Sequence, residues 1–295
     1  MTCFLLKIRN LAIILKYCLI FKQKRYVIFL LKKSKNYAKL QVILTLGEIC
    51  MLWGFFGIVH IVSLIFGAGI IVGLHFLLKN KSEKTKKIVL FCCSLLGIGA
   101  IIFNLVKWGS PLEYLPLHLC SLSALIIPIA VLTKNKILGN LLLLWSLGAV
   151  FALVVNTAQA NFEIFSATFF FYYFPHVFHL GIPILMFTLK LAKRDIKCIL
   201  STVAITMIAF TCAHFANVAI NNYCVANNVL DYAGNLIQVN YMYSIVPENP
   251  LLNLFYGLIP HQYWYMYLII PIIVIYLLVV YFDQFKALFK KNKQA

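Results

Sequence analysis

The chain has 295 residues, of which 63% are hydrophobic and only 12% charged. This composition excludes an ordinary soluble domain, because a fold of this size needs far more polar surface to stay in water. The formal net charge of +18 would suit a nucleic-acid-binding protein. The positions of the Lys and Arg residues indicate a membrane protein instead, and we expect no nucleic-acid partner.

Seven segments are apolar over enough residues to cross a hydrocarbon layer of roughly 30 Å. In chain order they are residues 53–78, 88–106, 115–132, 137–155, 167–189, 199–220 and 263–282. The sequence therefore predicts an all-α, polytopic membrane protein with about seven transmembrane helices in a single domain, residues 51–295. The connection 221–262, rich in Tyr and Asn and without Lys or Arg, is predicted to be an ordered outer cap.

The positive charges are distributed asymmetrically along the chain. Beyond Met51, every Lys and Arg except Lys107 lies in one of four stretches, which are 79–87, 134–136, 190–197 and 286–293. These stretches alternate with connections that carry no positive charge. The excess of Lys and Arg in cytoplasmic loops then predicts an amino end outside the cell and a carboxyl end inside.

The first fifty residues do not follow this pattern. They are strongly basic, with Glu48 as their single acid. We expect them to be translated upstream sequence, with the true start at Met51, because Gly47 and Glu48 can be encoded as GGAGAA, a ribosome-binding sequence. A basic interfacial segment is the alternative interpretation.

The motif LPLHLC, residues 115–120, carries the first candidates for chemistry. Ionisable groups inside a membrane are costly and usually functional, which draws attention to His118 and Cys120. A thiolate formed with the help of a histidine base is a nucleophile for an acyl carbonyl. A spacing of two residues places the two side chains on different faces of a helix, so the better base for Cys120 would come from another segment. The alternative is a packed thiol beside a histidine bonded to a carbonyl.

Two further motifs place histidines in the apolar segments. In PHVFH, His176 and His179 share one helical face at mid-membrane depth, as a base with its orienting partner or as two metal ligands. In CAHFAN, His214 stands three residues before Asn217, which would bind a headgroup or bridge two helices. Together with His60 and the histidine of LPLHLC, we expect them to face one chamber in the outer half of the bundle. No GxSxG, HExxH or P-loop motif is present, and we expect no cofactor and no resident metal.

These motifs together resemble a known family. LPLHLC in the third segment, FPHVFH in the fifth, and NYMYS followed by PENP before a final aromatic-led segment are similar to the bacterial YwaF-type integral membrane proteins, over about residues 51–282. That family is distantly similar to a eukaryotic transmembrane acyltransferase that makes polyunsaturated ether phospholipids with a cysteine. The resemblance implies a multi-pass protein of the bacterial plasma membrane, with Cys120 as the matching nucleophile.

The predicted function is acyl transfer or hydrolysis on a membrane lipid, a phospholipid or lysophospholipid, reached from the outer leaflet. Cys120 or an activated water attacks the ester, His118 or His176 moves the proton, and the other histidines, His179 and His214, orient these groups. Two other classes stay open. One is a transporter or small-molecule-binding membrane protein without covalent chemistry, and the other is a histidine-ligated, metal-dependent lipid hydrolase. The sequence indicates no oligomeric state.

Overall fold

A computed structural model describes residues 52–54, 57–108, 110–155, 162–231, 233–248 and 250–292. The two interpretations of residues 1–50, upstream sequence or basic interfacial segment, lie outside this described part of the chain. Everything that follows concerns the described residues.

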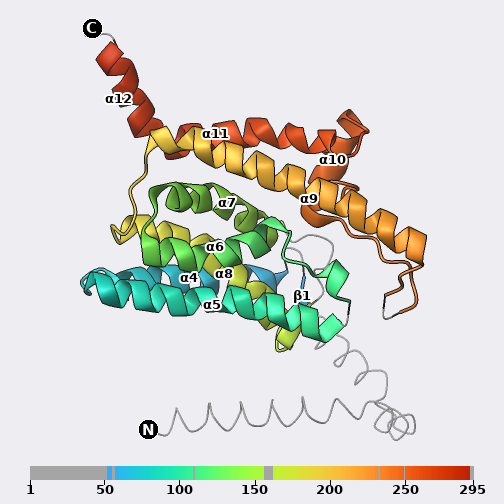
Figure 1. Cartoon of the computed structure of the whole chain (residues 1–295). Helices are drawn as coiled ribbons and strands as arrows, with labels where there is room; N and C mark the ends of the chain where they lie inside the picture. Colours follow the sequence, from blue (N-terminus) through green and yellow to red (C-terminus); the bar gives the residue numbers. More distant parts are fainter. Residues whose placement is uncertain are drawn as a thin grey trace, which may run out of the picture. The chain divides into compact units, whose positions relative to one another are not determined.

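The described chain is mostly helical (Figure 1). Its helices are α4 (Ile58–Leu78), α5 (Glu83–Trp108), α6 (Leu119–Thr133), α7 (Lys136–Val154), α8 (Ala167–Thr188), α9 (Ile199–Asn227), α10 (Pro250–Leu258), α11 (Ile270–Val280) and α12 (Phe282–Asn292). A 3-10 helix, Trp264–Ile269, leads directly into α11.

Five helices, α4, α5, α7, α8 and α9, are long and apolar enough to cross a membrane. Two shorter apolar stretches join them, α6 and the continuous helix Trp264–Val280. Each of the seven predicted apolar segments thus coincides with a helix of the structure. The all-α, multi-pass membrane class is confirmed, while the count of seven crossings and their orientation stay predictions.

The first segment begins later than the sequence predicts. Trp53 belongs not to a helix but to β1 (Leu52–Trp53), which pairs antiparallel with β2 (Phe162–Glu163). The helix α4 starts only at Ile58. The side chain of Trp53 is fully buried, and its indole N–H donates to Ser63 Oγ at 2.7 Å. A buried, hydrogen-bonded tryptophan cannot face lipid, which is why hydrophobicity alone misplaced this boundary.

The sixth segment extends further than predicted, because α9 continues to Asn227 rather than ending at residue 220. Asn221 lies on this extension, and its side-chain amide bonds to the backbone N–H and C=O of Val239 at 2.7 and 3.0 Å. These bonds hold the following connection against α9. The region predicted as an outer cap therefore consists of the last two turns of α9, the 3-10 turn Tyr241–Tyr243 and α10 with their connections.

The helix α8 lies in the middle of the packing, in contact with α4, α5, α6 and α7. The helix α9 packs on α7, where Trp145 donates its indole N–H to Thr206 Oγ1 at 2.8 Å. On α8, Ile182, Leu185 and Met186 are completely or almost completely buried. Four helices thus shield the side chains of α8, so polar groups on this helix must find partners within the protein.

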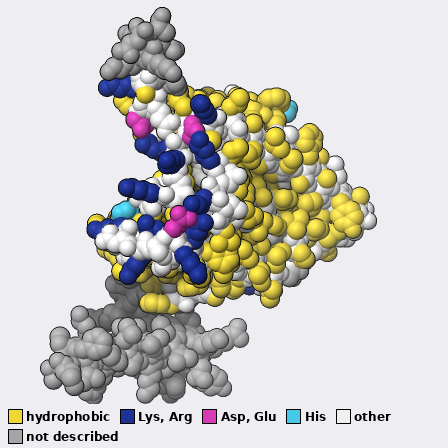
Figure 2. Space-filling view, turned by 60° about the vertical axis from the view of Figure 1, so that its left-hand side comes forward, with side chains coloured by type: hydrophobic (Ala, Val, Ile, Leu, Met, Phe, Trp, Pro, Cys, Tyr) yellow, Lys and Arg dark blue, Asp and Glu magenta, His cyan; other side chains and the backbone are white. Residues whose placement is uncertain are grey.

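The outer surface of the helices is strongly apolar. On α4, Ile58 is 83% and Ile65 is 67% exposed, and similar side chains form the broad hydrophobic surface in Figure 2. Monomeric soluble proteins rarely expose continuous apolar surface of this extent. In a membrane protein, lipid acyl chains cover it.

Three of the four basic stretches, 79–87, 134–136 and 190–197, come together at one end of the helices, and the third contacts the start of α12. Figure 2 shows Lys and Arg gathered there around a few acidic side chains. Three ion pairs link the stretches: Lys134 with Glu83, Lys136 with Asp195, and Arg194 with Asp283. We call this end the basic end. The positive-inside rule predicts that it faces the cytoplasm.

The carboxylate of Asp195 connects two of these stretches, and we predict a pH-dependent contribution to stability. Its hydrogen bond with Lys136 lowers the pKa of Asp195 below its usual value. A carboxyl group with a lowered folded-state pKa stabilises the fold above its unfolded pKa of about 4. That contribution disappears as the pH falls through the lowered value. Thermal unfolding in detergent should show wild type above Asp195→Asn at pH 7 and convergence in acid. A difference that is constant across this range would contradict the prediction.

Candidate functional site

The motif LPLHLC spans the start of α6. His118 is the last extended residue before the helix, with φ −74° and ψ 152°, and Leu119 is the first helical residue. Cys120 is therefore the second residue of α6, and its neighbour Pro116 precedes the helix. The break in conformation separates the two candidate side chains, and each of them contacts a different part of the protein.

The thiol of Cys120 lies against the imidazole of His176 on α8, within range of an electrostatic interaction between the two groups. The imidazole Nδ1 of His176 lies 2.6 Å from the carbonyl oxygen of Tyr172. Because a carbonyl oxygen only accepts hydrogen bonds, Nδ1 carries the hydrogen and Nε2 keeps the lone pair that faces the thiol. The structure thus brings together a thiol, an imidazole and a carbonyl that orients the imidazole, the types of group that covalent catalysis uses.

The start of α6 supplies further polar contacts to the thiol. The backbone N–H and the hydroxyl of Ser121 lie beside the thiol of Cys120. The N–H groups in the first turn of a helix have no partners within the helix and form the positive end of its dipole. A thiolate at this place is stabilised by both effects. Position and partners therefore favour a reactive cysteine at residue 120.

His118 turns towards the cap rather than towards the thiol. Its Nδ1 accepts a hydrogen bond of 3.3 Å from the backbone N–H of Met242. The imidazole centroid also lies 5.4 Å from the ring of Tyr241 and 5.6 Å from that of Tyr243. LPLHLC thus contacts two other motifs. Cys120 lies against His176 of PHVFH, and His118 lies against NYMYS.

Residues 240–244, NYMYS, form a segment that we call the cap segment. Its anchor is Asn217 on α9, whose side chain is fully buried. Asn217 accepts from the N–H of Tyr241 at 2.8 Å and donates to the carbonyl of Tyr241 at 2.8 Å and to Ser244 Oγ at 2.9 Å. His214, one turn earlier, places Nδ1 3.0 Å from the same hydroxyl. Burial raises the pKa of Tyr241 to about 12, so its phenol stays protonated and donates to the carbonyl of Leu112.

We expect Asn217→Ala to release the cap segment. The substitution removes the side-chain partner of the buried backbone N–H of Tyr241, which costs about 2 kcal/mol. Limited proteolysis should cut the region 228–248 faster, with unfolding at a lower temperature. Asn227→Ala on the same helix is the matched control, because its exposed amide bonds only within α9, to the carbonyl of Tyr223. Equal protease resistance of the two variants would contradict this anchoring role.

The remaining predicted histidines are placed differently. His179 is buried beside His176, with ring centroids 5.9 Å apart, and within the described residues neither of its ring nitrogens has a hydrogen-bond partner. The carbonyl of Tyr172, not His179, contacts Nδ1 of the base. His60 bonds to the carbonyl of Leu153 at 2.6 Å and packs on the indole of Trp53, so the prediction of one chamber shared by all five histidines is wrong for His60.

Three partners of the site were missed by the sequence analysis, namely Tyr172, Ser121 and Ser244. A signal existed for Tyr172, because it stands four residues before His176 and so lies on the same helical face. Ser244 could be found only from the packing of the cap. Across the described ranges, no group of three or more His, Cys, Asp or Glu side chains is arranged to hold a metal ion.

The apolar helices and the site between them define a multi-pass integral membrane protein with a cysteine–histidine pair at the contact of two helices. The chain belongs to the TMEM164 family, a family of transmembrane proteins, whose model matches residues 55–281. The match includes LPLHLC, PHVFH and the cap segment. No curated protein and no solved structure was found to match the chain.

Proposed function

We propose that the protein is a lipid acyltransferase or lipid hydrolase of the bacterial plasma membrane that works from the outer leaflet through Cys120 and His176. The observation that carries the proposal is the position of this thiol against the imidazole of His176, whose Nδ1 is held by the carbonyl of Tyr172. The resemblance to YwaF-type proteins and to a cysteine-dependent lipid acyltransferase supports the same chemistry.

In the first step, His176 Nε2 takes the thiol proton of Cys120, and the thiolate attacks the ester carbonyl carbon of a phospholipid. The new C–S bond forms as the ester C–O bond breaks. The leaving lysophospholipid alkoxide takes the proton back from the imidazolium. The acyl group is then held on Cys120 as a thioester.

In the second step, the hydroxyl of an acceptor attacks the thioester, and His176 accepts its proton. The C–S bond breaks, the acyl chain moves to the acceptor oxygen, and the thiolate regains the proton. A lysophospholipid acceptor gives transfer, whereas water gives hydrolysis. Both reactions use the same residues. The acceptor that reaches the thioester, lysophospholipid or water, therefore decides whether transfer or hydrolysis occurs.

A lipid substrate is supported by the surroundings of the pair. An apolar pocket of about 210 Å³ lies between α4, α7 and α8, and its lining includes Gly67, Tyr173 and Val177. The last two flank His176 on α8. An acyl chain is the matching occupant for such a lining, because it carries no polar group that would need a partner. We expect the cap segment, held by His118, His214 and Asn217, to close over a headgroup.

The test is lipid mass spectrometry on cells that express the full chain. We expect the ratio of one phospholipid to its lysophospholipid to change with wild type and not with Cys120→Ala. Cys212→Ala, which removes an exposed thiol on α9, is the matched control and should behave as wild type. An unchanged lipid profile in all three strains would overturn the proposal. Exchange of a substrate across sealed vesicles without a product would instead support the transporter alternative.

A further inference from the structure

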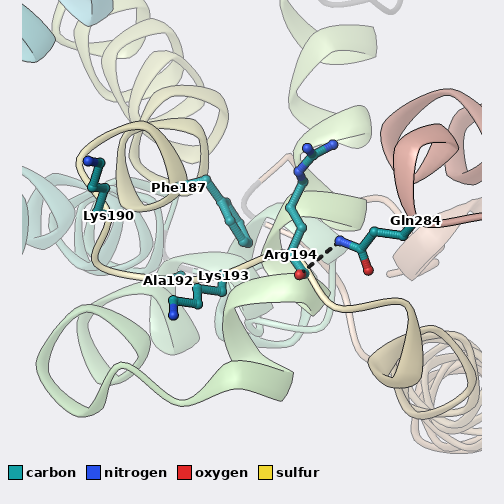
Figure 3. Close-up of a pocket in the computed structure, with 6 residues that line it drawn as sticks. All are labelled: Phe187, Lys190, Ala192, Lys193, Arg194 and Gln284. Carbon is teal, nitrogen blue, oxygen red and sulfur yellow. Dashed lines mark hydrogen bonds between the residues drawn. The ribbon is translucent and has the colours of Figure 1, made fainter. Parts of the chain in front are cut away.

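A second pocket lies at the basic end, three turns along α8 from His176. Its volume is about 400 Å³, and it lies between the connection from α8 to α9 and the start of α12. Figure 3 shows its lining, formed by Phe187, Lys190, Ala192, Lys193, Arg194 and Gln284. We call it the basic pocket. It shares no residue with the site around Cys120.

The charge of the basic pocket is positive and only partly compensated. Arg194 donates to Asp283 Oδ2 at 3.1 Å and to the carbonyl of Val280, which leaves further guanidinium N–H groups for a ligand. In the described part of the chain, neither ammonium group of Lys190 and Lys193 forms a hydrogen bond or an ion pair. The pocket thus holds two cations more than its neighbouring acid can balance.

Side-chain amides fix the backbone that carries these charges. Gln284 of α12 donates to the carbonyl of Arg194 at 2.9 Å (Figure 3). It also accepts from the N–H of Ile196 at 2.8 Å. Asn140, buried on α7, donates to the carbonyl of Lys193 at 3.2 Å. The connection is therefore held on both sides of the pocket. The backbone that carries the cations is thus already fixed before a ligand binds, which reduces the entropy lost on binding.

The surroundings of the basic pocket are apolar. At the end of α11, Val279 is 71% exposed, and at the start of α12, Phe282 is 66% exposed. On α12, Phe282 and Phe285 stand three residues apart, the spacing of side chains on one helical face, as in a helix that lies in a membrane interface. Cations beside exposed apolar side chains mark the level of lipid headgroups rather than of open water.

We propose that the basic pocket binds the phosphate of an anionic phospholipid headgroup in the leaflet at the basic end. Lys190, Lys193 and the free N–H groups of Arg194 contact the phosphate oxygens, and Phe187 packs against the glycerol and the first acyl carbons. The lipid joins the connection between α8 and α9 to α12. The proposal does not depend on the chemistry at Cys120.

The experiment is native mass spectrometry of the purified full chain in nanodiscs that contain phosphatidylcholine with a minor share of phosphatidylglycerol. The double variant Lys190→Gln/Lys193→Gln removes the two unbalanced cations. We expect it to weaken phosphatidylglycerol binding about 30-fold, from the usual contribution of a basic residue near an anionic lipid. Lys79→Gln/Lys81→Gln, which removes the same charge from another connection at the basic end, is the matched control and should change binding less than about twofold.

Glycerol 3-phosphate separates the two possible sources of phosphate, because it carries the same group without acyl chains. We expect it to leave the bound phosphatidylglycerol in place at millimolar concentration. Displacement by glycerol 3-phosphate would keep the phosphate site but overturn its assignment to a lipid. Equal losses in the two double variants would overturn the proposal itself, since general attraction to the basic end would then explain the binding.

Discussion

Cys120→Ala protein should accumulate in the membrane yet form no thioester and no transferred or hydrolysed product. His176→Gln should lower the rate of product formation about 10²- to 10⁴-fold, the usual contribution of a positioned general base. His118→Gln should lower it less than tenfold, since Nδ1 of His118 binds the N–H of Met242 rather than the thiol. This order of effects distinguishes the base from the histidine that is closer to Cys120 in sequence.

The measurement combines lipid turnover with the alkylation rate of Cys120, followed on its own peptide by mass spectrometry. A maleimide reports the fraction of thiolate, so the alkylation of Cys120 should slow strongly in His176→Gln and little in His118→Gln. Cys212 is an internal control in the same samples, because its exposed thiol should react equally in every variant. If Cys120→Ala keeps its activity while His176→Gln loses it, the attacking group is water, and the role of the thiol is refuted.

The helical architecture was largely predictable from the sequence. Spans of apolar residues reveal helices because the bilayer excludes water from the backbone, and the same rule holds for every segment. Of the four basic stretches predicted to share one side of the membrane, the first three meet at one end of the structure, and Arg194 pairs there with Asp283 at the start of α12. The predicted start of the first segment was wrong. Hydrophobicity does not distinguish a Trp53 that faces lipid from one that is buried in an aromatic core.

The sequence predicted the residues of the candidate site but not the contacts between them. Sequence spacing correctly separates Cys120 from His118 on a helix, and it indicates that the base comes from elsewhere. It leaves His176 as one of two candidate bases beside His118, because the approach of α6 to α8 depends on how side chains of three helices pack. The same holds for the cap segment, where the partners Asn217 and Tyr241 are far apart in the chain.

The helices that carry Cys120 and His176 approach α5 closely at Gly97. A Cβ atom at this position would lie 2.8 Å from Ala124 Cβ on α6 and 2.8 Å from His179 Nε2 on α8. Ala124 stands one turn after Cys120, and His179 stands one turn after His176. The absence of a side chain at one glycine therefore lets three helices approach where the thiol and its base must meet, as small residues do in membrane proteins.

Gly97→Leu should consequently separate Cys120 from His176. Leucine gains about 0.8 kcal/mol of helix propensity over glycine. Overpacking costs about 1–3 kcal/mol. The clash therefore exceeds the gain, and α6 and α8 must move apart. We expect at least a tenfold slower alkylation of Cys120, by the loss of its base, and unfolding at a lower temperature. Gly69→Leu on α4 is the matched control, because no atom lies within 4 Å of its added Cβ. A folded Gly97→Leu protein with wild-type alkylation would show that the pair does not depend on this contact.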